Sequence, residues 1–346
     1  MSGNPYRKSF QYQLWDYQVI SDFDLGELEP VYGDSRVRGT LHLNLAPNED
    51  WAQPGGDAVI EDHLDDGRVW FASWKIGDES DWDGYVARFP GLCSFRIRPD
   101  EMRIDCAPAP GAGESTIVHL ILDQAIPRLL SLKDGYVVLH ASAVQVENQV
   151  IAILGQSGQG KSTLAAWLAA QGSPLLTDDC LVVLRDEATR QWLAQPSYQS
   201  VRLWPDSVDA LGIKNSALRE FAHYSSKKRT SKQVDFRFAS AGAPLRACFV
   251  LASPTDAAPA HSGPPVLRPL SVNEVFIALV QGVFRLDVQN AQLNRREFEV
   301  LTSMTESVRF WSLSYEREYD RLPEVQKAII ETVRTRGRAP EERKLP

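Results

Sequence analysis

The chain has 346 residues, which is enough for one large domain or two ordinary domains with their own cores. It carries 37 Lys and Arg against 45 Asp and Glu, a formal net charge of −8, so no global field draws it toward nucleic acid or an anionic membrane. The first residues lack the apolar core of a signal peptide, and no apolar run approaches the roughly 18 residues that a membrane span needs, so we expect a cytoplasmic protein.

The N-terminal part of the chain predicts a small β-rich domain over residues 1–112. Apolar and polar residues alternate in short segments at 38–45, 68–74, 84–89 and 92–98, and turn sequences separate these segments. A period of two is typical of antiparallel strands that bury one face. We expect the aromatic residues between 70 and 89 to lie in the core of this domain, with a peptide-docking face as the alternative.

Longer elements follow a linker at 108–113 that is rich in Pro, Gly and Ala. Strands are predicted at 136–139, 143–146, 150–154 and 181–184. Helices are predicted at 118–126, 164–170, 272–284 and 320–333. Residues 253–265 predict a surface loop, and 334–346 predict a disordered tail with too few apolar side chains to pack. The predicted fold class is α/β: a catalytic domain over 113–333, with a mixed sheet and flanking helices, preceded by the smaller β-rich domain.

The most informative segment is a complete phosphate-binding loop. It has the pattern G-x-x-x-x-G-K-[ST] and lies between an apolar strand and a helical segment, the setting in which such a loop functions. Backbone N–H groups of the turn and of the helix N-terminus can surround nucleotide phosphates, Lys161 adds a positive charge, and Ser162 can offer its hydroxyl to Mg²⁺. The predicted nucleotide-binding residues are Gly155, Gln156, Ser157, Gly158, Gln159, Gly160, Lys161, Ser162 and Thr163.

An acidic pair, Asp178 and Asp179, follows 17 and 18 residues after Lys161 and directly precedes an apolar strand. This spacing returns the chain to the side of the loop, where one carboxylate could act as a general base and the other could bind Mg²⁺. The sequence leaves open which residue has which role, and Ser162 and Asp179 are the predicted metal ligands. An ordinary turn cap is the alternative. A transporter ATPase is disfavoured because the signature sequence of that family is absent from the chain.

His140 ends a predicted strand 15 residues before Gly155. A histidine in that place is more often structural than catalytic. The turn that leads from this strand to the loop would nevertheless bring His140 near the phosphates, where it could donate a hydrogen bond to a transferred phosphoryl group or orient a carboxylate.

The three features together resemble the HPr serine kinase/phosphorylase family, in their order and in their spacing. The matching residues are His140 with Ala141, the loop at 155–163, and Asp178 with Asp179, and the resemblance covers residues 115–290. It implies a kinase that uses ATP and Mg²⁺ and transfers the γ-phosphoryl group to a serine hydroxyl. By the same resemblance, the catalytic residues are His140, Asp178 and Asp179.

Within that family, the segments 139–144 and 201–206 look more like the divergent proteins that accompany peptide-modification systems. Ala141 stands where the bifunctional enzymes have glycine, and the glycine-rich element of their phosphorylase reaction is not evident. The best-understood divergent members phosphorylate the C-terminal serine of lasso-peptide precursors, so the resemblance implies that kind of acceptor. The alternatives are a kinase/phosphorylase that acts on a carrier protein and a non-catalytic module that binds nucleotide and peptide.

Cationic residues after the acidic pair are further candidates for contacts with phosphate or with a peptide carboxylate. Arg202 lies in an apolar segment, whereas Lys227, Lys228 and Arg229 form a basic cluster that could equally be a solvated loop. Tyr198 and Trp204 are predicted to pack in the core, with stacking against an adenine or lining of a peptide groove as the alternative. The expected partner is a precursor peptide, with no nucleic acid and no membrane, and the resemblance permits a homo-oligomer.

The four cysteines are far apart in the sequence. They form neither a C-x-x-C pair nor a cluster with histidine, so the sequence does not indicate a zinc site. We expect reduced thiols in the core at Cys93, Cys106, Cys180 and Cys248.

Overall fold

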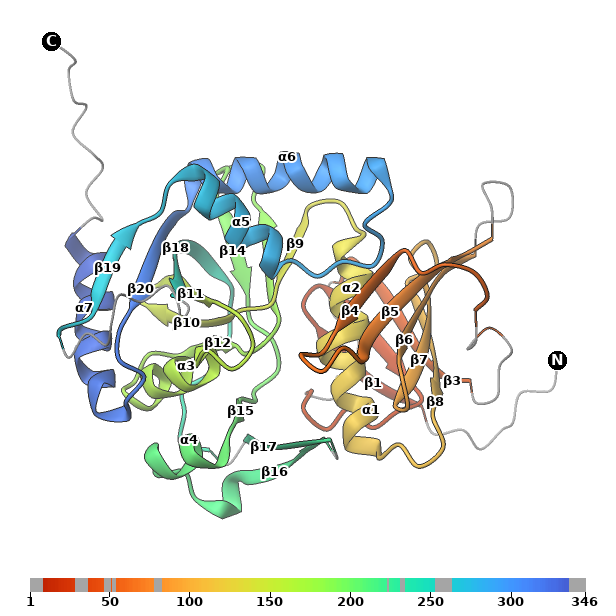
Figure 1. Ribbon diagram of the computed structural model, residues 1–346, viewed down its shortest axis with the longest axis horizontal. Helices are drawn as coiled ribbons and strands as arrows, with labels where there is room; N and C mark the ends of the chain where they lie inside the picture. Colours follow the sequence, from red (N-terminus) through yellow and green to blue (C-terminus); the bar gives the residue numbers. More distant parts are fainter. Residues whose placement is uncertain are drawn as a thin grey trace, which may run out of the picture.

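The protein is described from a computed structural model, which covers residues 9–28, 37–46, 51, 54–77, 83–222, 224–230, 234–252 and 263–335. Over these residues it is a mixed α/β protein in which one long helix stands between two large sheets (Figure 1). Most of the expected loop at 253–265 and nearly all of the expected tail at 334–346 lie outside the described residues.

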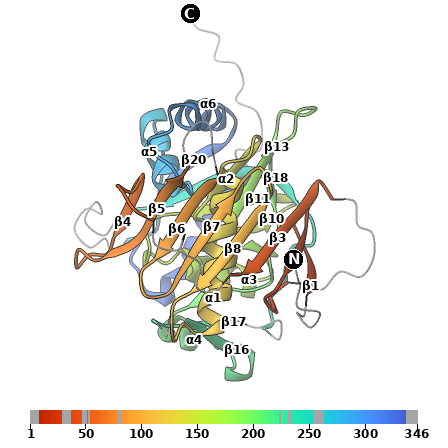
Figure 2. The same cartoon turned by 90° about the vertical axis from the view of Figure 1, so that its right-hand side faces the viewer.

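Eight strands of the described N-terminal part form one sheet, in the order β1-β2-β3-β8-β7-β6-β5-β4. Figure 2 looks onto this sheet, with β4 at one edge and β1 at the other. Most neighbours are antiparallel as expected, but β3 runs parallel to both β2 and β8. The strands are β1 (Phe10–Leu14), β2 (Tyr17–Ser21), β3 (Gly39–Leu45), β4 (Ile60–His63), β5 (Val69–Ile76), β6 (Gly84–Phe89), β7 (Cys93–Arg98) and β8 (Arg103–Pro108).

The long helix is built from α1 (Glu114–Leu120), a π-helical turn η2 (Ile121–Ala125) and α2 (Ile126–Ser131). It confirms the helix predicted at 118–126 and extends it at both ends. Leu120, Ile121 and Leu122 are fully buried, because the helix contacts apolar side chains on more than one side. One continuous hydrophobic core joins the helix to the N-terminal sheet and to the following strands. The N-terminal sheet is therefore packed onto the rest of the chain through this helix.

The second large sheet has nine strands in the described residues, in the order β12-β10-β11-β18-β14-β13-β9, with β20 beside β18 and β19 beside β20. The neighbours β11, β18 and β20 are parallel, and the other pairs are antiparallel. The strands are β9 (Tyr136–Leu139), β10 (Ser142–Val146), β11 (Gln149–Leu154), β12 (Leu175–Thr177), β13 (Leu181–Arg185), β14 (Trp192–Gln195), β18 (Ala243–Leu251), β19 (Val266–Pro269) and β20 (Arg309–Ser314).

Helices cover both faces of this sheet. Ile151 and Ile153 of β11 share a core with α3 (Lys161–Ala170) and α7 (Leu322–Thr335). Val150 and Leu154 of the same strand share the opposite core with α5 (Val272–Gly282) and α6 (Ala291–Ser307). Because β11 is buried on both faces, its sequence is an apolar run rather than an alternating one, as in other covered parallel strands.

A small third sheet lies below the others in Figure 1 and has the order β15-β17-β16. Its surroundings include a short helix and two 3₁₀ turns, one of them just before α7. The elements are β15 (Arg202–Leu203), α4 (Pro205–Ala210), η3 (Asn215–Ala217), β16 (Leu218–Ala222), β17 (Ser225–Thr230) and η4 (Tyr319–Arg321). The basic cluster at 227–229 is therefore a strand and not a solvated loop.

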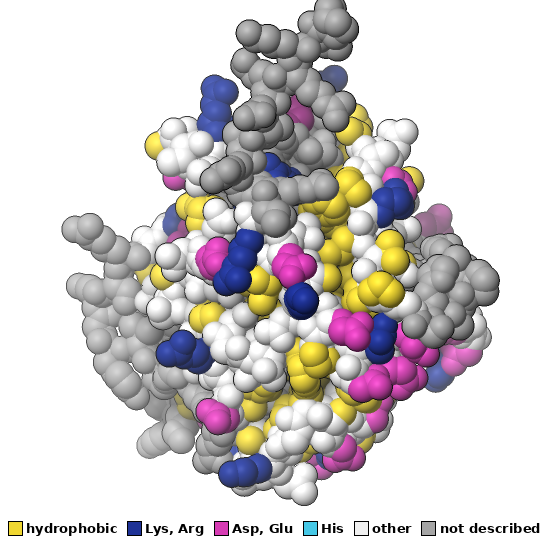
Figure 3. Space-filling view, turned by 90° about the vertical axis from the view of Figure 1, so that its left-hand side faces the viewer, with side chains coloured by type: hydrophobic (Ala, Val, Ile, Leu, Met, Phe, Trp, Pro, Cys, Tyr) yellow, Lys and Arg dark blue, Asp and Glu magenta, His cyan; other side chains and the backbone are white. Residues whose placement is uncertain are grey.

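Within the described residues, no helix has the length and apolar character needed to cross a membrane. On the face that carries α7 and β19, positive and negative side chains are interspersed (Figure 3). All four cysteines are free and buried, which confirms the expected core thiols.

Replacement of Leu120 by alanine tests the shared core. Deletion of a fully buried leucine side chain leaves a cavity, so we expect the free energy of unfolding to fall by about 2–5 kcal/mol. The control Val272→Ala removes methyl groups from a side chain that is 68% exposed, and should change stability by less than about 0.5 kcal/mol. Urea denaturation followed by circular dichroism measures both. Two separate transitions, of which only one moves, would contradict a continuous core.

Candidate active site

The predicted phosphate loop has the geometry that such a loop requires. Strand β11 ends at Leu154, and α3 begins at Lys161 after a glycine-rich turn. Gly155 and Gly160 have φ angles of 150° and 91°, which residues with a side chain rarely adopt. Gly160 is the N-cap of α3, and no side chain caps this helix. The helix N-terminus therefore presents backbone N–H groups to the cavity that Gly160, Lys161 and Ser162 line.

The side chain of Lys161 lies inside the loop. Its Nζ donates hydrogen bonds to the carbonyl oxygens of Gly155 (2.8 Å) and Gln156 (3.1 Å). Burial lowers the pKa of this ammonium group, although Asp179 and Asp178 oppose the shift. In the same turn, the Oε1 atom of Gln159 accepts a hydrogen bond from the backbone N–H of Gln156 (2.8 Å). Oxygen atoms of the loop thus accept the hydrogen bonds from Lys161 and from the Gln156 backbone that phosphate oxygens could accept instead.

The two aspartates differ in their surroundings. Asp178 follows β12 and is fully buried; it accepts hydrogen bonds from the Ser142 hydroxyl (2.6 Å) and from the backbone N–H of Arg202 (2.9 Å). Burial raises its pKa, and the neighbouring Asp179 adds to the effect. Asp178 is not among the residues that line the cavity.

Asp179 is the carboxylate of the pair that faces the cavity, and 15% of its side chain is exposed. Its φ angle is 63°, in the left-handed region that residues other than glycine rarely adopt. Burial alone would raise the pKa of Asp179, but the fields of Arg202, Lys227 and Lys161 hold it well below its usual range. Asp179 is therefore ionised at neutral pH.

His140 lies beside Asp179. The distance from its Nε2 to Asp179 Oδ1 is 3.9 Å, and its backbone N–H donates to the carbonyl of Gly282 (2.7 Å). Burial of the ring by the cavity walls, together with the charge of Lys161, lowers the pKa of His140 to about 4, although 36% of its side chain still faces the opening. At neutral pH the ring is uncharged and can donate a hydrogen bond without adding positive charge.

Arg202 connects the acidic pair to the long helix. Its fully buried guanidinium lies 3.4 Å from Asp179 Oδ2 through Nη1, and through Nη2 it donates to both carboxylate oxygens of Asp123 (2.6 Å each). Asp123 lies in the π-helical turn η2, and its Oδ2 also contacts Nδ1 of His119 (2.6 Å). The hydroxyl of Tyr198 contacts both Asp123 and Arg202. This network holds Arg202, and through it Asp179, in one position.

Sequence reasoning did not identify Asp123. The available signal was an aspartate four residues after His119, both within a run that is otherwise apolar. An amphipathic surface helix would expose such residues, whereas here His119 and Asp123 are buried. The π-turn itself leaves no mark in the sequence that would have distinguished it from an ordinary helix.

The predicted basic cluster is divided between two faces of β17. Lys227 lines the cavity, and its Nζ lies 5.3 Å from the ring centre of Trp204. Lys228 is exposed, and Arg229 is buried in an ion pair with Glu27. Trp204 is 43% exposed and lines the cavity, so the prediction that it packs in the core is wrong, while Tyr198 is buried as predicted.

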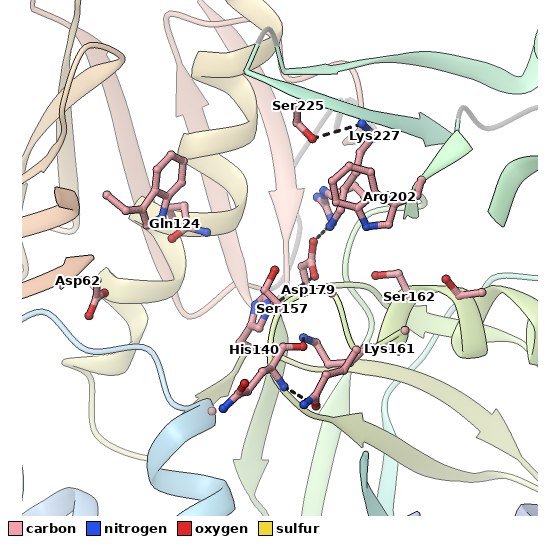
Figure 4. A pocket seen from close by; sticks show the side chains of 18 of the residues that line it. Asp62, Gln124, His140, Ser157, Lys161, Ser162, Asp179, Arg202, Ser225 and Lys227 are labelled. Carbon is pink, nitrogen blue, oxygen red and sulfur yellow. Dashed lines mark hydrogen bonds and ion pairs between the residues drawn. The ribbon is translucent and has the colours of Figure 1, made fainter. Parts of the chain in front are cut away.

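These groups surround one cavity of about 1780 Å³ (Figure 4). Its floor includes the phosphate loop, Asp179 and His140, and its far wall comes from the N-terminal sheet and the long helix, including Trp70 and Gln124. Small-molecule sites usually measure about 300–1,000 Å³, so the cavity has room for a nucleotide and part of a second substrate. Among the described residues, no three His, Cys, Asp or Glu side chains form a metal cluster.

Neither the protein-family models nor the curated proteins give a match to the sequence. Among solved structures, the HPr(Ser) kinase/phosphatase from Coxiella burnetii aligns with 58% of this chain and 99% of its own, at 11% identity and a TM-score of 0.31. The two structures are only distantly alike. The function proposed below therefore rests on the geometry of the cavity.

Replacement of Arg202 by methionine tests the buried network. The change leaves Asp123 and Asp178 without their shared cation, so we expect a loss of about 3–5 kcal/mol in the free energy of unfolding. Arg268→Met is the matched control, because that exposed arginine pairs with exposed Glu274 and such pairs contribute about 0–1 kcal/mol. Equal losses in the two variants, measured by urea denaturation, would show that the network does not stabilise the fold.

The lowered pKa of His140 makes stability depend on pH. The folded value is about 4, against about 6.5 in the unfolded chain, so the unfolded state binds more protons between these values. The contribution is fully present above about pH 6.5 and is lost as the pH falls toward 4. We expect His140→Gln to make the fall in the free energy of unfolding over this range shallower. Parallel curves for the variant and the wild type would contradict the assignment.

Proposed function

We propose that the protein is an ATP- and Mg²⁺-dependent kinase that transfers the γ-phosphoryl group to a serine hydroxyl of a peptide. The observation that carries the proposal is the position of Asp179. This ionised carboxylate opens onto the same cavity as the uncapped N-terminus of α3 and the side chain of Lys161. A general base must lie within reach of the acceptor hydroxyl beside the phosphates, and Asp179 is the ionised carboxylate of the pair that opens there.

The triphosphate would bind to the loop at 155–160 and to the N-terminus of α3. Its oxygens would replace the two loop carbonyls as partners of Lys161 Nζ, so the lysine charge would move from the loop to the phosphates. Trp204 and Lys227 lie on the same cavity wall and offer an aromatic face and a second positive charge. The bound phosphates would thus be surrounded by backbone N–H groups and cations.

The donor set suits Mg²⁺. Mg²⁺ commonly takes one or two protein oxygens and completes its shell with phosphate oxygens and water. Of the two ligands predicted from the sequence, which both line the cavity, the Ser162 hydroxyl would hold the ion, and Asp179 would be left for the acceptor hydroxyl. When bound there, the ion neutralises charge on the phosphates.

Transfer requires the serine hydroxyl oxygen to bond to the γ-phosphorus while the bond from that phosphorus to the β,γ-bridging oxygen breaks, with ADP as the leaving group. Asp179 would hold the hydroxyl and accept its proton. His140, uncharged at neutral pH, would donate a hydrogen bond to a γ-phosphoryl oxygen or to Asp179. Asp178, enclosed by Ser142 and Arg202, would keep its neighbour in position rather than touch the substrate.

The acceptor we propose is the C-terminal serine of a lasso-type precursor peptide. The cavity is larger than a nucleotide site, and its far wall belongs to the N-terminal sheet and the long helix. A peptide entering from that side would bring a hydroxyl to Asp179. A carrier protein of the HPr type is the rival acceptor.

The kinase proposal is tested by intact-mass analysis of a serine-terminated lasso-type precursor and of an HPr-like protein, each incubated with the purified chain and Mg-ATP. We expect one phosphoryl increment on the peptide, which disappears when its serine is replaced by alanine. Lys161→Ala should abolish it, and Asp179→Asn should lower the rate about a hundredfold, the typical contribution of a general base. Lys327→Ala, a change of an exposed residue on α7, is the control.

Three results would count against this proposal in different ways. An increment on the carrier protein alone would assign the chain to the carrier-directed branch. ATP binding with no increment on either acceptor would favour a module that binds peptide without modifying it. An unchanged rate in Asp179→Asn would contradict the assigned base.

A further inference from the structure

Arg128 is a buried cation in the far wall of the cavity. It lies in α2, is 7% exposed, and is among the residues that line the cavity. Its Cζ is 3.9 Å from the ring centre of Phe71 and 5.3 Å from that of Phe284. The rings hold the guanidinium in place from the N-terminal sheet and from the segment after α5, and they provide part of its stabilisation through cation–π contacts.

No acidic group in the described residues forms an ion pair with Arg128. Its hydrogen bonds run from Nη1 to the carbonyl oxygen (3.2 Å) and the Oε1 atom (2.7 Å) of Gln124. Nε is buried and has no partner. Burial lowers the pKa of the group to about 10, with the field of Asp62 opposing the shift, so Arg128 remains charged at neutral pH. A buried charge of this kind costs free energy unless a ligand compensates it.

The guanidinium nitrogens of Arg128 that are not bound to Gln124 favour one kind of anion, a carboxylate. With Nη1 bound to Gln124, Nε is covered and without a partner, so a carboxylate that displaces the groups covering Nε would meet the two parallel N–H groups of Nε and Nη2. The nucleotide phosphates already have the loop and the N-terminus of α3, which belong to a different wall. In Figure 4, Gln124 and Asp62 lie on one side of the view and Ser162 on the other. The anion that suits Arg128 is therefore carried by the acceptor.

Arg128 is also close to the reacting groups. The ring centre of Phe284 is 6.1 Å from that of His140, and His140 Nε2 is 3.9 Å from Asp179 Oδ1. Through these contacts the guanidinium lies at most about 16 Å from the Asp179 carboxylate, a span of up to about five extended residues at 3.3–3.6 Å each.

We propose that Arg128 binds the C-terminal carboxylate of the acceptor peptide and so selects a serine close to the chain end. This inference rests on the proposed kinase function, because the acceptor hydroxyl is taken to lie at Asp179. Arg128 would thus determine substrate specificity by binding a group of the peptide that takes no part in phosphoryl transfer. Asp62, which lines the same cavity, opposes the binding of any carboxylate and keeps the interaction selective for one that fits the guanidinium edge.

The test compares two forms of one probe. N-acetyl-alanyl-serine and a longer peptide ending in serine are prepared as free acids and as C-terminal amides, and their dissociation constants are measured by calorimetry. Loss of hydrogen bonds to a charged group typically weakens binding about 10- to 100-fold, so the wild type should prefer the acid by that factor. Arg128→Met should bind acid and amide equally, and the control Arg268→Met should keep the preference.

Further variants keep the inference testable if Arg128→Met does not fold. Arg128→Lys retains the charge over the phenylalanine rings but not the bidentate edge, so it should lose most of the preference for the acid. Asp62→Asn should tighten binding of the acid but not of the amide. Arg128 could instead bind a side-chain carboxylate of the peptide. An amidated peptide with aspartate next to the serine tests this alternative, and we expect it to bind no better than the plain amide. If that peptide regains the preference, the terminal carboxylate is the wrong source.

Peptide binding and phosphoryl transfer are measured separately, so the two proposals can fail independently. An acid preference that disappears in Arg128→Met, without phosphoryl transfer to any peptide, would uphold the role of Arg128 in binding and overturn the kinase function. Transfer to acid and amide with equal KM would uphold the kinase and overturn the role of Arg128. A merely structural arginine would alter both forms equally, so a preference that survives in Arg128→Met also overturns the inference.

Discussion

The burial of one arginine among three aspartates organises the site. Arg202 contacts Asp123 from the long helix and both members of the acidic pair, and none of its side chain is exposed. In a medium of low polarity, the carboxylates around Arg202 stabilise its charge, and Arg202 in turn compensates theirs. Three segments that are distant in the sequence are thereby fixed at one point. The orientation of Asp179 depends on this arrangement.

The same network gives the two aspartates of the acidic pair different surroundings. Asp178 is turned inward, toward Ser142 and the backbone of Arg202, and Asp179 faces the cavity from a left-handed backbone conformation. Two adjacent residues of the same chemical type thus differ in exposure and in the direction of their pKa shifts. This asymmetry supports our proposal that Asp179, and not Asp178, contacts the substrate.

The sequence was informative where the chemistry is local. A glycine pattern, a following lysine and an apolar strand are sufficient to place the loop at 155–160, because turn, charge and strand are adjacent in the chain. The strands at 136–139 and 150–154 followed from their apolar character for the same reason. Asp123 and Arg128 were missed because their importance comes from partners such as Arg202 and Phe71, which only tertiary packing brings close. The division of 227–229 between two faces likewise depends on where β17 pairs.

The continuous core around α1, η2 and α2 limits how this protein can be altered. The N-terminal sheet has no core of its own, since the helix that it covers also packs against Val138 of β9 and Val182 of β13 in the second sheet. Exchange of that sheet for one from another protein would expose the apolar surface of the long helix and disturb the π-helical turn that carries Asp123. A change of the acceptor that we propose would therefore be more readily achieved by altering side chains on the cavity wall than by exchanging the whole sheet. Evolution of such a chain would proceed by point substitution around a retained scaffold.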